Sequence, residues 1–328
     1  MPDLTWLEPL TQHFQLGDPE PPQPIQIGLI HQTWKLGTPQ GSFIAQRLHP
    51  IFDPAVTEDG QTISQWLRHQ GFPTPHFRRA RDGSLHLTWA GGLWRVMECL
   101  PGSCHQTPPD WGYLEQAGAA IGRLHQLLAQ FEHQFRFRIP HFHDTAHIWR
   151  QLHRYSPTPE VQAEWQFLIE TVPTLFLPSG IPTQIIHADL KFNNFLFDEQ
   201  GQFVGLLDLD TFMHHNLYIE LGDALRSWGK QGETIQAEAI LAGLRGYAQT
   251  GNLRALQPEL ILQGIQLITL ELGMRFLQDW FEDSYWNWDP QRYPSRKAHN
   301  LARCRQQIRL YQALKAVAPQ LLGSIHAL

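Results

Sequence analysis

The spacing of apolar and polar residues divides the chain into a front part with strand-like patterns and a longer rear part with helical ones. A helix is predicted over residues 4–14, followed by a proline-rich connector at 19–24. Short apolar runs bounded by glycine-bearing turns then predict an antiparallel sheet, with a helix inserted at 57–70. The predicted strands are 25–27, 32–36, 43–48, 86–89 and 93–98.

After residue 110, apolar residues recur at intervals of three and four, which is the period of amphipathic helices. Helices are predicted at 111–131, 160–171, 224–228 and 263–283, and from 299 onwards. Gly118 and Gly122 would allow a neighbouring helix to approach closely. Asp144 is expected to cap a helix rather than to join a metal-binding cluster with the nearby histidines. A second cap is expected where Gly222 and Asp223 precede residue 224.

The stretch 185–210 has a different pattern, in which short buried strands alternate with polar loops. Apolar segments at 185–186 and 195–197 bracket a loop, so its polar groups can be held rigidly. A hairpin turn at 199–202 and a returning strand at 203–207 would bring Asp208 close to Asn194. A carboxylate and an amide are therefore expected to converge.

Phosphoryl transfer requires this combination of groups: an acidic base beside the attacking hydroxyl, and hard oxygen ligands for a magnesium ion. Asp189 is the candidate base. Asn194 and Asp208 are the candidate metal ligands, and Asp210 is a candidate to support or share the metal. His187 is expected to brace the loop, because this transfer needs no second base.

A hydrolytic metal site could also be drawn from the same region. It would use His187, Asp189, Asp208, His214 and His215. The chain contains 18 histidines, so pairs of histidine beside aspartate arise easily by chance. We therefore favour phosphoryl transfer.

Composition narrows the class of protein. With 328 residues, 42% hydrophobic and 17% charged, the chain is typical of a soluble globular protein large enough for two domains. A formal charge of −6 without a basic run argues against a nucleic-acid partner. No apolar run approaches membrane-spanning length, and the start lacks the features of a signal peptide. Three cysteines fit a reducing compartment, so a cytoplasmic location is expected.

The stretch His187-Ala-Asp-Leu-Lys-Phe-Asn-Asn, followed by a strand ending in Asp208, resembles the catalytic and metal loops of protein kinases. It is more similar to those of the aminoglycoside phosphotransferase family, which includes choline kinase-like small-molecule kinases. Other motifs make the chain look like the N-acetylhexosamine 1-kinase branch. These motifs begin at Gly28, Gln46, Phe142, Leu209, Gly222, Glu271 and His299.

The resemblance implies an α+β, bilobal protein-kinase-like fold, with a β-rich N-lobe at 1–100 and a mostly helical C-lobe at 101–328. It implies ATP and Mg²⁺ as cofactors, and transfer of the γ-phosphoryl group to the anomeric hydroxyl of an N-acetylated hexosamine. The turn from Gly28 to Thr33 would cover the phosphates, and the backbone from Glu98 to Leu100 would face adenine. The usual strand lysine is missing; Gln46 or Arg47 occupies its place, and Glu58 would be the matching acid.

For the acceptor, the branch points to Arg275, Trp280, Asn300 and Arg303. Arginine and asparagine donors beside indole rings suit a neutral sugar better than a polycationic aminoglycoside. Two alternatives stay open. One is a kinase for another small alcohol or amino alcohol. The other is a catalytically silent nucleotide-binding regulator, which the missing lysine favours and the intact Asp189, Asn194 and Asp208 oppose.

Overall fold

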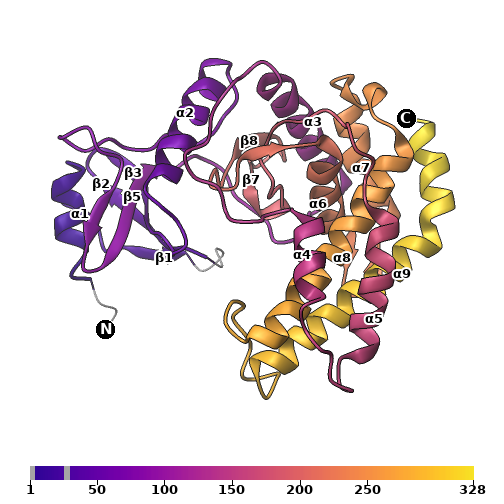
Figure 1. Cartoon of the computed structure of the whole chain (residues 1–328). Coiled ribbons are helices and arrows are strands. Elements are labelled where there is room, and N and C mark those ends of the chain that lie inside the picture. The colour runs from indigo at the N-terminus through magenta and orange to yellow at the C-terminus, as the bar shows by residue number, and fades with distance from the viewer. Residues whose placement is uncertain (1–3, 26–29) are drawn as a thin grey trace.

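A computed structural model describes residues 4–25 and 30–328 and shows two lobes, a small sheet lobe and a larger helical lobe (Figure 1). The smaller lobe contains a five-stranded antiparallel sheet of strand order β1-β2-β3-β5-β4. Its strands are β1 (Gln23–Ile25), β2 (Gln32–Thr38), β3 (Gly41–Arg47), β4 (Leu87–Trp89) and β5 (Gly92–Glu98). The expected bilobal α+β architecture is confirmed. Gly28 and the rest of 26–29 lie outside the described residues.

The two faces of this sheet carry different side chains, because successive strand residues point to opposite sides. One face packs against helix α1 (Leu7–His13) and Trp6, whose ring stacks on Trp94 with centroids 4.7 Å apart. Ala45 and Val96 share that buried apolar layer. Gln46 and Arg95, one position along on β3 and β5, therefore lie on the opposite face.

Helix α2 (Ala55–His69) lies between the sheet and the helical lobe (Figure 1). Its Gln61 side chain accepts a hydrogen bond from the backbone N–H of Phe77 at 3.0 Å. Gly60 of α2 faces the segment that carries Asp208: a methyl group there would lie in van der Waals contact with Cβ of Leu209, at 3.6 Å. The helix thus contacts both the sheet and the predicted metal segment.

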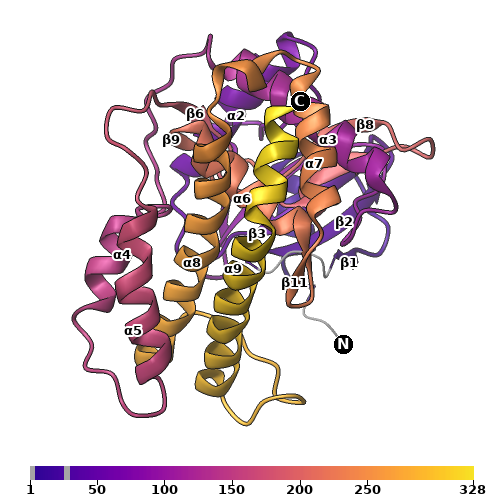
Figure 2. The same ribbon diagram turned by 90° about the vertical axis from the view of Figure 1, so that its right-hand side faces the viewer.

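The larger lobe is built from helices. They are α3 (Trp111–Leu128), α4 (Thr145–Leu152), α5 (Gln162–Thr171), α6 (Leu217–Gly229), α7 (Ala237–Ala248), α8 (Pro258–Glu282) and α9 (Arg296–His326). The long helices α8 and α9 run side by side, with α4 and α5 next to them (Figure 2). Further close pairs are α3 with α7 and α6 with α8. Most predicted helices are present, with ends displaced by a few residues.

Glycines set two of these helix contacts. Gly118 of α3 lies against the backbone of Gly243 on α7, as the sequence suggested. Gly222 lies in the middle of α6, against the backbone of Gly264 on α8. The prediction that Gly222 and Asp223 open a helix is therefore wrong: α6 begins at Leu217, and Asn216 caps it. The predicted cap at Asp144 is confirmed by its 2.9 Å hydrogen bond from the N–H of His147.

Helix α8 is long and apolar enough to cross a membrane, which corrects the expectation that no stretch approaches that length. However, 72% of its most apolar window is buried inside the protein. Its neighbours α6 and α9 account for that burial. The apolar surface of α8 is thus explained by packing in the larger lobe.

Two short antiparallel strand pairs hold the central stretch. Strand β6 (Gln184–Ile186) pairs with β9 (Met213–His215), and β7 (Phe195–Phe197) pairs with β8 (Phe203–Leu206). The backbone of Ser103, in the connection from the sheet lobe, pairs with Phe197 through hydrogen bonds of 2.8 and 2.9 Å. The lobe connection is therefore anchored to the hairpin that follows the predicted catalytic loop.

A second segment also links the lobes. Residues 129–144, which we call the strap, run from the end of α3 past the sheet lobe to α4. Asp59 of α2 is buried and accepts hydrogen bonds from the N–H groups of Arg136 (2.9 Å) and Phe137 (3.1 Å) and from the His133 ring (2.9 Å). Phe137 also packs against Phe52. The strap is thus fixed to α2 by both polar and apolar contacts.

Candidate active site

One buried carboxylate holds the backbone of the loop after β6. Glu220 of α6 accepts hydrogen bonds from the N–H groups of His187 (2.8 Å) and Ala188 (2.7 Å). Burial alone would raise the pKa of Glu220, but the His125 ring and these bonds keep the pKa below its usual value. Ala188 has a φ of 67°, a conformation that costs a non-glycine residue energy and needs such support.

The ring of His187 connects this loop to the metal segment. It is fully buried, and its Nε2 donates to the carbonyl oxygen of Leu207 at 3.0 Å. Its Nδ1 lies 3.3 Å from the N–H of Asp189, which donates to it. The expected bracing role of His187 is confirmed by these contacts.

Asp189 is the third residue of the loop after β6 and is partly accessible. Its Oδ2 is 2.7 Å from Nζ of Lys191. Burial raises the pKa of the Asp189 carboxyl, Lys191 partly offsets this, and the nearby Asp208 carboxylate adds to the rise. Burial would lower the pKa of the Lys191 ammonium, but Asp189 and Asp208 raise it overall. Lys191 is thus a cation beside the candidate base; it follows the base by two positions but was not singled out from the sequence.

Asn194 and Asp208 come together as predicted. The N–H of Leu207 donates to the carbonyl oxygen of Asn194 at 2.8 Å, so Asp208 is the next residue after that contact. The side-chain nitrogen of Asn194 donates to the carbonyl oxygen of Asp189 at 2.8 Å. Because the amide nitrogen is occupied in this way, its oxygen is the atom left for a cation.

This donor set suits a magnesium ion. Asp208 has a φ of 62°, which turns its side chain at the end of β8, and no hydrogen bond to its carboxylate is found among residues 4–25 and 30–328. Hard divalent cations prefer carboxylate and amide oxygens. Asn194 and Asp208 therefore fit the metal role, which stays a prediction.

Asp210, two residues further on, has different partners. Arg95 of β5 donates to both of its carboxylate oxygens at 2.6 Å, and the His31 ring donates to Oδ2 at 2.8 Å. Burial would raise the pKa of Asp210, but Arg95 and His31 hold it well below its usual value. Asp210 is thus an inter-lobe ion-pair partner, neither a solvated acid nor a free metal ligand.

The sheet residues at the place of the missing lysine lie on opposite faces. Gln46 lies on the face that carries Arg95 and accepts from its Nε (2.9 Å) and Nη2 (2.7 Å). The Gln46 amide donates to Thr33 at 3.3 Å, so both predicted nucleotide residues lie on this face. Arg47 lies on the α1 face, where it is opposite Trp94. A phosphate contact by Arg47 would need a large movement of its side chain.

On the sheet face that carries Gln46, the cation is Arg95. The acid paired with Arg95 is Asp210 and not Glu58. The sequence did not indicate Arg95 because Arg95 and Gln46 become neighbours only when β3 pairs with β5. The two residues are 49 positions apart along the chain.

The predicted adenine-facing segment begins at the end of β5. The N–H of Glu98 donates to His76 (2.9 Å), and its carboxylate pairs with Arg68 at 2.9 Å. Leu100 lies against Gly205 of β8, where a methyl group on the glycine would come within 2.9 Å of a Leu100 methyl. Leu100 thus lies beside the β7–β8 hairpin, and its role toward adenine stays a prediction.

Arg275 is the predicted acceptor residue nearest to the catalytic loop along α8. It is one helical turn after Glu271, which binds the segment before α4. Its guanidinium lies over the rings of Phe142 (5.6 Å), Tyr285 (6.0 Å) and Trp286 (5.2 Å). It makes no hydrogen bond or ion pair within the part of the chain that the structure describes. A guanidinium on aromatic faces keeps its N–H edge available for a ligand.

The other three acceptor candidates are tied into the protein. Asn300 is fully buried and donates to Asp279 at 2.8 Å, and Trp280 is buried in the apolar layer around α8. Arg303 donates to the carbonyl oxygen of Asn287 at 2.9 Å and to Asn300 at 3.2 Å. These contacts support the structure locally; a role in acceptor binding stays a prediction.

The histidines of the hydrolytic alternative do not converge. The His214 ring donates to the carbonyl oxygen of His133 at 3.0 Å, and His215 accepts from the N–H of Asn216 at 2.9 Å. His187 is occupied by Leu207. Among the described residues, a group with possible metal-ligand spacing is found at His141, Asp144 and His147 on the surface. The two rings there stack in parallel, 3.4 Å apart, so their nitrogens do not point at one centre.

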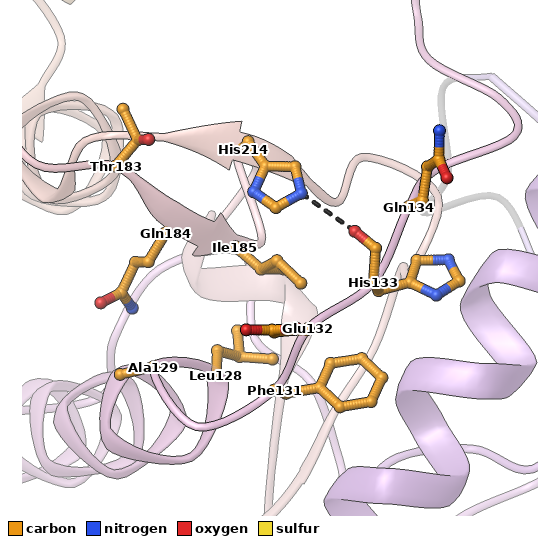
Figure 3. A pocket seen from close by; sticks show the side chains of 10 residues that line it. All are labelled: Leu128, Ala129, Phe131, Glu132, His133, Gln134, Thr183, Gln184, Ile185 and His214. Carbon is orange, nitrogen blue, oxygen red and sulfur yellow. Dashed lines mark hydrogen bonds between the residues drawn. The ribbon is translucent and has the colours of Figure 1, made fainter.

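A hollow of about 490 Å³ lies beside His133 and His214 (Figure 3). It lies between the end of α3, the first part of the strap, and the paired strands β6 and β9, where Figure 3 shows the hydrogen bond from His214 to His133. Its lining includes His214 of the hydrolytic alternative but none of the residues predicted for the kinase site. We therefore assign neither the nucleotide nor the acceptor to it.

Comparison with known proteins adds three findings. Residues 22–256 match the family described as the Phosphotransferase enzyme family. Curated relatives include a homoserine kinase of Bartonella tribocorum, 24% identical over 79% of this chain and 81% of that protein. Another is a homoserine kinase of Caulobacter vibrioides, 23% identical over 84% and 86%.

Solved structures with the same fold include an aminopropanol kinase associated with a microcompartment, with a TM-score of 0.71, 15% identity, and coverage of 97% of this chain and 98% of that one. A second is amicoumacin kinase hAmiN in complex with AMP-PNP, Ca²⁺ and Ami, with a TM-score of 0.68 and 21% identity over 94% and 93%. At sequence identities of 15% and 21%, the similarity of these structures shows a shared fold.

Proposed function

This chain belongs to the Phosphotransferase enzyme family, and on that premise we propose that it is a kinase that transfers the γ-phosphoryl group of ATP to a hydroxyl of a small molecule. The observation that carries the proposal is the convergence of Asp189, Asn194 and Asp208 within one short stretch of backbone. The named activities of the relatives, homoserine kinase and aminopropanol kinase, support the same reaction class.

In the proposed reaction, Asp189 accepts the proton of the acceptor hydroxyl. The hydroxyl oxygen then forms a bond to the γ-phosphorus as the bond to the ADP oxygen breaks. Lys191, 2.7 Å from Asp189, balances negative charge at the site and orients the carboxylate. The Asn194 side chain holds the carbonyl of Asp189 and thereby fixes the base.

Asn194 and Asp208 would hold a magnesium ion, which neutralises charge on the phosphates. Support comes from the donor chemistry of these two residues and from the AMP-PNP and Ca²⁺ in the complex of amicoumacin kinase hAmiN. The face of the sheet that carries Thr33 and Gln46 would cover the nucleotide.

For the acceptor, the resemblance to the N-acetylhexosamine 1-kinase branch favours the anomeric hydroxyl of a neutral hexose or N-acetylhexosamine. Arg275 and three surrounding rings could supply donors and a stacking surface for such a sugar. Asp279, to which Asn300 is bonded, lies about 12 Å along α8 from Glu271, because it is eight residues further on. A monosaccharide at Asp189 would therefore contact Arg275 before it reached Asn300.

A second acceptor class is a small hydroxy amino acid such as homoserine. The specific observation in its favour is the free N–H edge of Arg275, which suits a carboxylate bound by two parallel hydrogen bonds. The homoserine kinases among the relatives point the same way. A carboxylate ligand would give Arg275 the anionic partner that it lacks among the described residues.

A coupled ADP-release assay over free sugars, N-acetylhexosamines, amino alcohols, homoserine and aminoglycosides tests the function. Stimulation by a sugar supports the first acceptor class, and stimulation by homoserine supports the second. In the second case Arg275→Ala should raise KM for homoserine at least tenfold, the usual order for a lost charged contact, without changing KM for ATP. Nucleotide binding without ADP release for any acceptor would favour the silent regulator.

We also propose a cytoplasmic location, which is supported by three free cysteines among the described residues. Fractionation of cells that express the chain from its own gene, probed with an antibody, would test this location.

A further inference from the structure

His143 lies between the acceptor helix α8 and the catalytic loop, and both of its ring nitrogens face hydrogen-bond acceptors. Nδ1 is 3.0 Å from Oε1 of Glu271, and Nε2 is 3.0 Å from the carbonyl oxygen of Ala188. The side chain is 5% exposed, so water does not replace either partner. A carboxylate and a carbonyl cannot donate, so both contacts form only when both ring nitrogens carry a proton.

We propose that His143, held as an imidazolium, is a positioning residue that ties α8 to the carbonyl directly before Asp189 and so fixes the orientation of the base. The inference rests on the proposed kinase function. It adds a residue outside the predicted site, at the end of the strap just before α4.

The contact falls where the backbone most needs support. Ala188 adopts a φ of 67°, and its N–H is held by Glu220. His143 holds the opposite side of the same residue, at its carbonyl oxygen. The two bonds together fix the peptide planes on both sides of Ala188, and Asp189 follows directly.

The charged surroundings favour the imidazolium. Glu271 faces it from α8 and is also bonded by the Thr145 hydroxyl; Asp223 faces it from α6 and is paired with Arg226. The charges that oppose it are further away: Arg275 one turn along α8 and the Lys191 ammonium beside Asp189. His215 of β9 lies next to His143; burial lowers the pKa of His215, and the positive charge of His143 lowers it further.

Two substitutions separate the two contacts. In His143→Gln the amide nitrogen can occupy the place of Nε2 and keep the bond to Ala188. In His143→Asn it can occupy the place of Nδ1 and keep only the bond to Glu271. With the acceptor found in the ADP-release assay, His143→Asn should lower kcat by a factor on the order of one hundred, the effect of a small displacement of a catalytic group. His143→Gln should stay within about tenfold of the native enzyme, and KM for ATP should be unchanged in both. Equal kcat values for the two variants, at equal thermal stability, would overturn the proposal.

A third substitution, Glu271→Gln, tests the charge state. The neutral amide of this variant can donate to Nδ1, so a neutral His143 could still donate from Nε2 to Ala188. The native enzyme should therefore lose kcat at alkaline pH as His143 loses its proton, and Glu271→Gln should lose less. An identical alkaline decline in both would contradict the proposal.

Nitrogen NMR of histidine-labelled protein provides a readout that needs no acceptor. The native protein at pH 8 should show an imidazolium signal that is missing in His143→Gln. A neutral His143 at pH 8 overturns the inference even if the kinase activity is found. An imidazolium in a protein without activity on any acceptor would instead count against the proposed function.

Discussion

Single residues carry the chemistry, and Asp189 is the one whose replacement should separate turnover from binding. Asp189→Asn keeps the size of the side chain but removes the base and the partner of Lys191. We expect kcat to fall by about two to four orders of magnitude, the range for losing general acid–base help, with nucleotide affinity nearly native. Single-turnover kinetics and a nucleotide titration would measure both quantities. A variant with near-native turnover would exclude Asp189 as the base.

The two candidate metal ligands should differ in the strength of their effect. Asp208→Ala removes a charge from beside the cation, whereas Asn194→Ala removes a neutral ligand and also the bond to the Asp189 carbonyl. We expect both to raise the magnesium concentration needed for nucleotide binding, Asp208→Ala more, and Asn194→Ala also to lower kcat. Calorimetric titration at several magnesium concentrations would check this. An unchanged metal requirement for Asp208→Ala would remove that residue from the site.

His143 should also make stability depend on pH. Burial lowers its pKa, but Glu271 at 3.0 Å more than reverses this and raises the pKa of His143 to about 9. The folded state therefore holds the proton more tightly than the unfolded chain, whose histidine has a pKa near 6.5. The resulting stabilisation, up to about 3 kcal/mol, is complete below pH 6.5 and is lost as the pH rises to about 9.

Urea unfolding of the native protein and of His143→Gln between about pH 6 and 9.5 would show this effect. The free energy of unfolding of the native protein should fall across the window relative to that of the variant. Parallel curves would mean that His143 is neutral in the folded protein.

At the residue scale, the sequence indicated the side chains whose spacing is local. Asp189 and Asn194 are five positions apart on one loop, and the hairpin turn before Phe203 predicted the arrival of Asp208. Arg95 was missed because its partner Asp210 is 115 positions away. No local pattern indicates which cation a buried carboxylate will meet.

At the scale of elements, a few close contacts set the distance between neighbouring helices. Gly222 of α6 is the clearest example. It contacts the backbone of Gly264, where a methyl group would come within 2.6 Å of main-chain atoms. We expect Gly222→Ala to destabilise the protein by about 1–3 kcal/mol, since two helices must move apart. Urea unfolding would measure the loss.

Gly323 of α9 provides the matched control, because a methyl group there would meet nothing within 4 Å. Gly323→Ala should be neutral or stabilising by up to about 1 kcal/mol, from helix propensity alone. If both variants had the same stability, the α6–α8 contact would not be tight.

The same glycine explains the error in predicting α6. Aspartate after a glycine is a common local signal for a helix start, and propensity gave no reason to begin the helix before the glycine. The start at Asn216 depends on the cap, whereas the continuation depends on burial against α8. Tertiary packing therefore overrode the local signal, whereas α3, with its unbroken apolar periodicity, was predicted at 111–131 and is found at Trp111–Leu128.

For the whole molecule, the bilobal architecture was predictable because strand-like and helical patterns occupy separate parts of the chain. The strap was not predictable: residues 129–144 show no regular period, and their attachment depends on Asp59, a residue more than 70 positions earlier. Nothing in the local sequence distinguishes Asp59 from an ordinary surface carboxylate of a helix.

Removing this attachment should loosen the connection between the lobes. Asp59→Ala leaves the N–H groups of Arg136 and Phe137 without their buried partner. We expect a loss of about 3 kcal/mol of stability and faster hydrogen exchange over 133–139. Glu58→Ala, one position earlier on α2 and without a bond to the described residues of the strap, is the matched control. Equal exchange rates in both variants would show that Asp59 does not fix the strap.

The strap also limits how the two lobes can move. The sheet lobe is joined to the helical lobe at several places, among them the connection at Ser103, the strap at Asp59 and the bond from the N–H of Leu206 to the carbonyl oxygen of Pro73. The buried ion pair between Arg95 and Asp210 is another, and it joins the sheet directly to the segment that carries Asp208. A movement that separates the sheet from that segment must therefore break the Arg95–Asp210 pair.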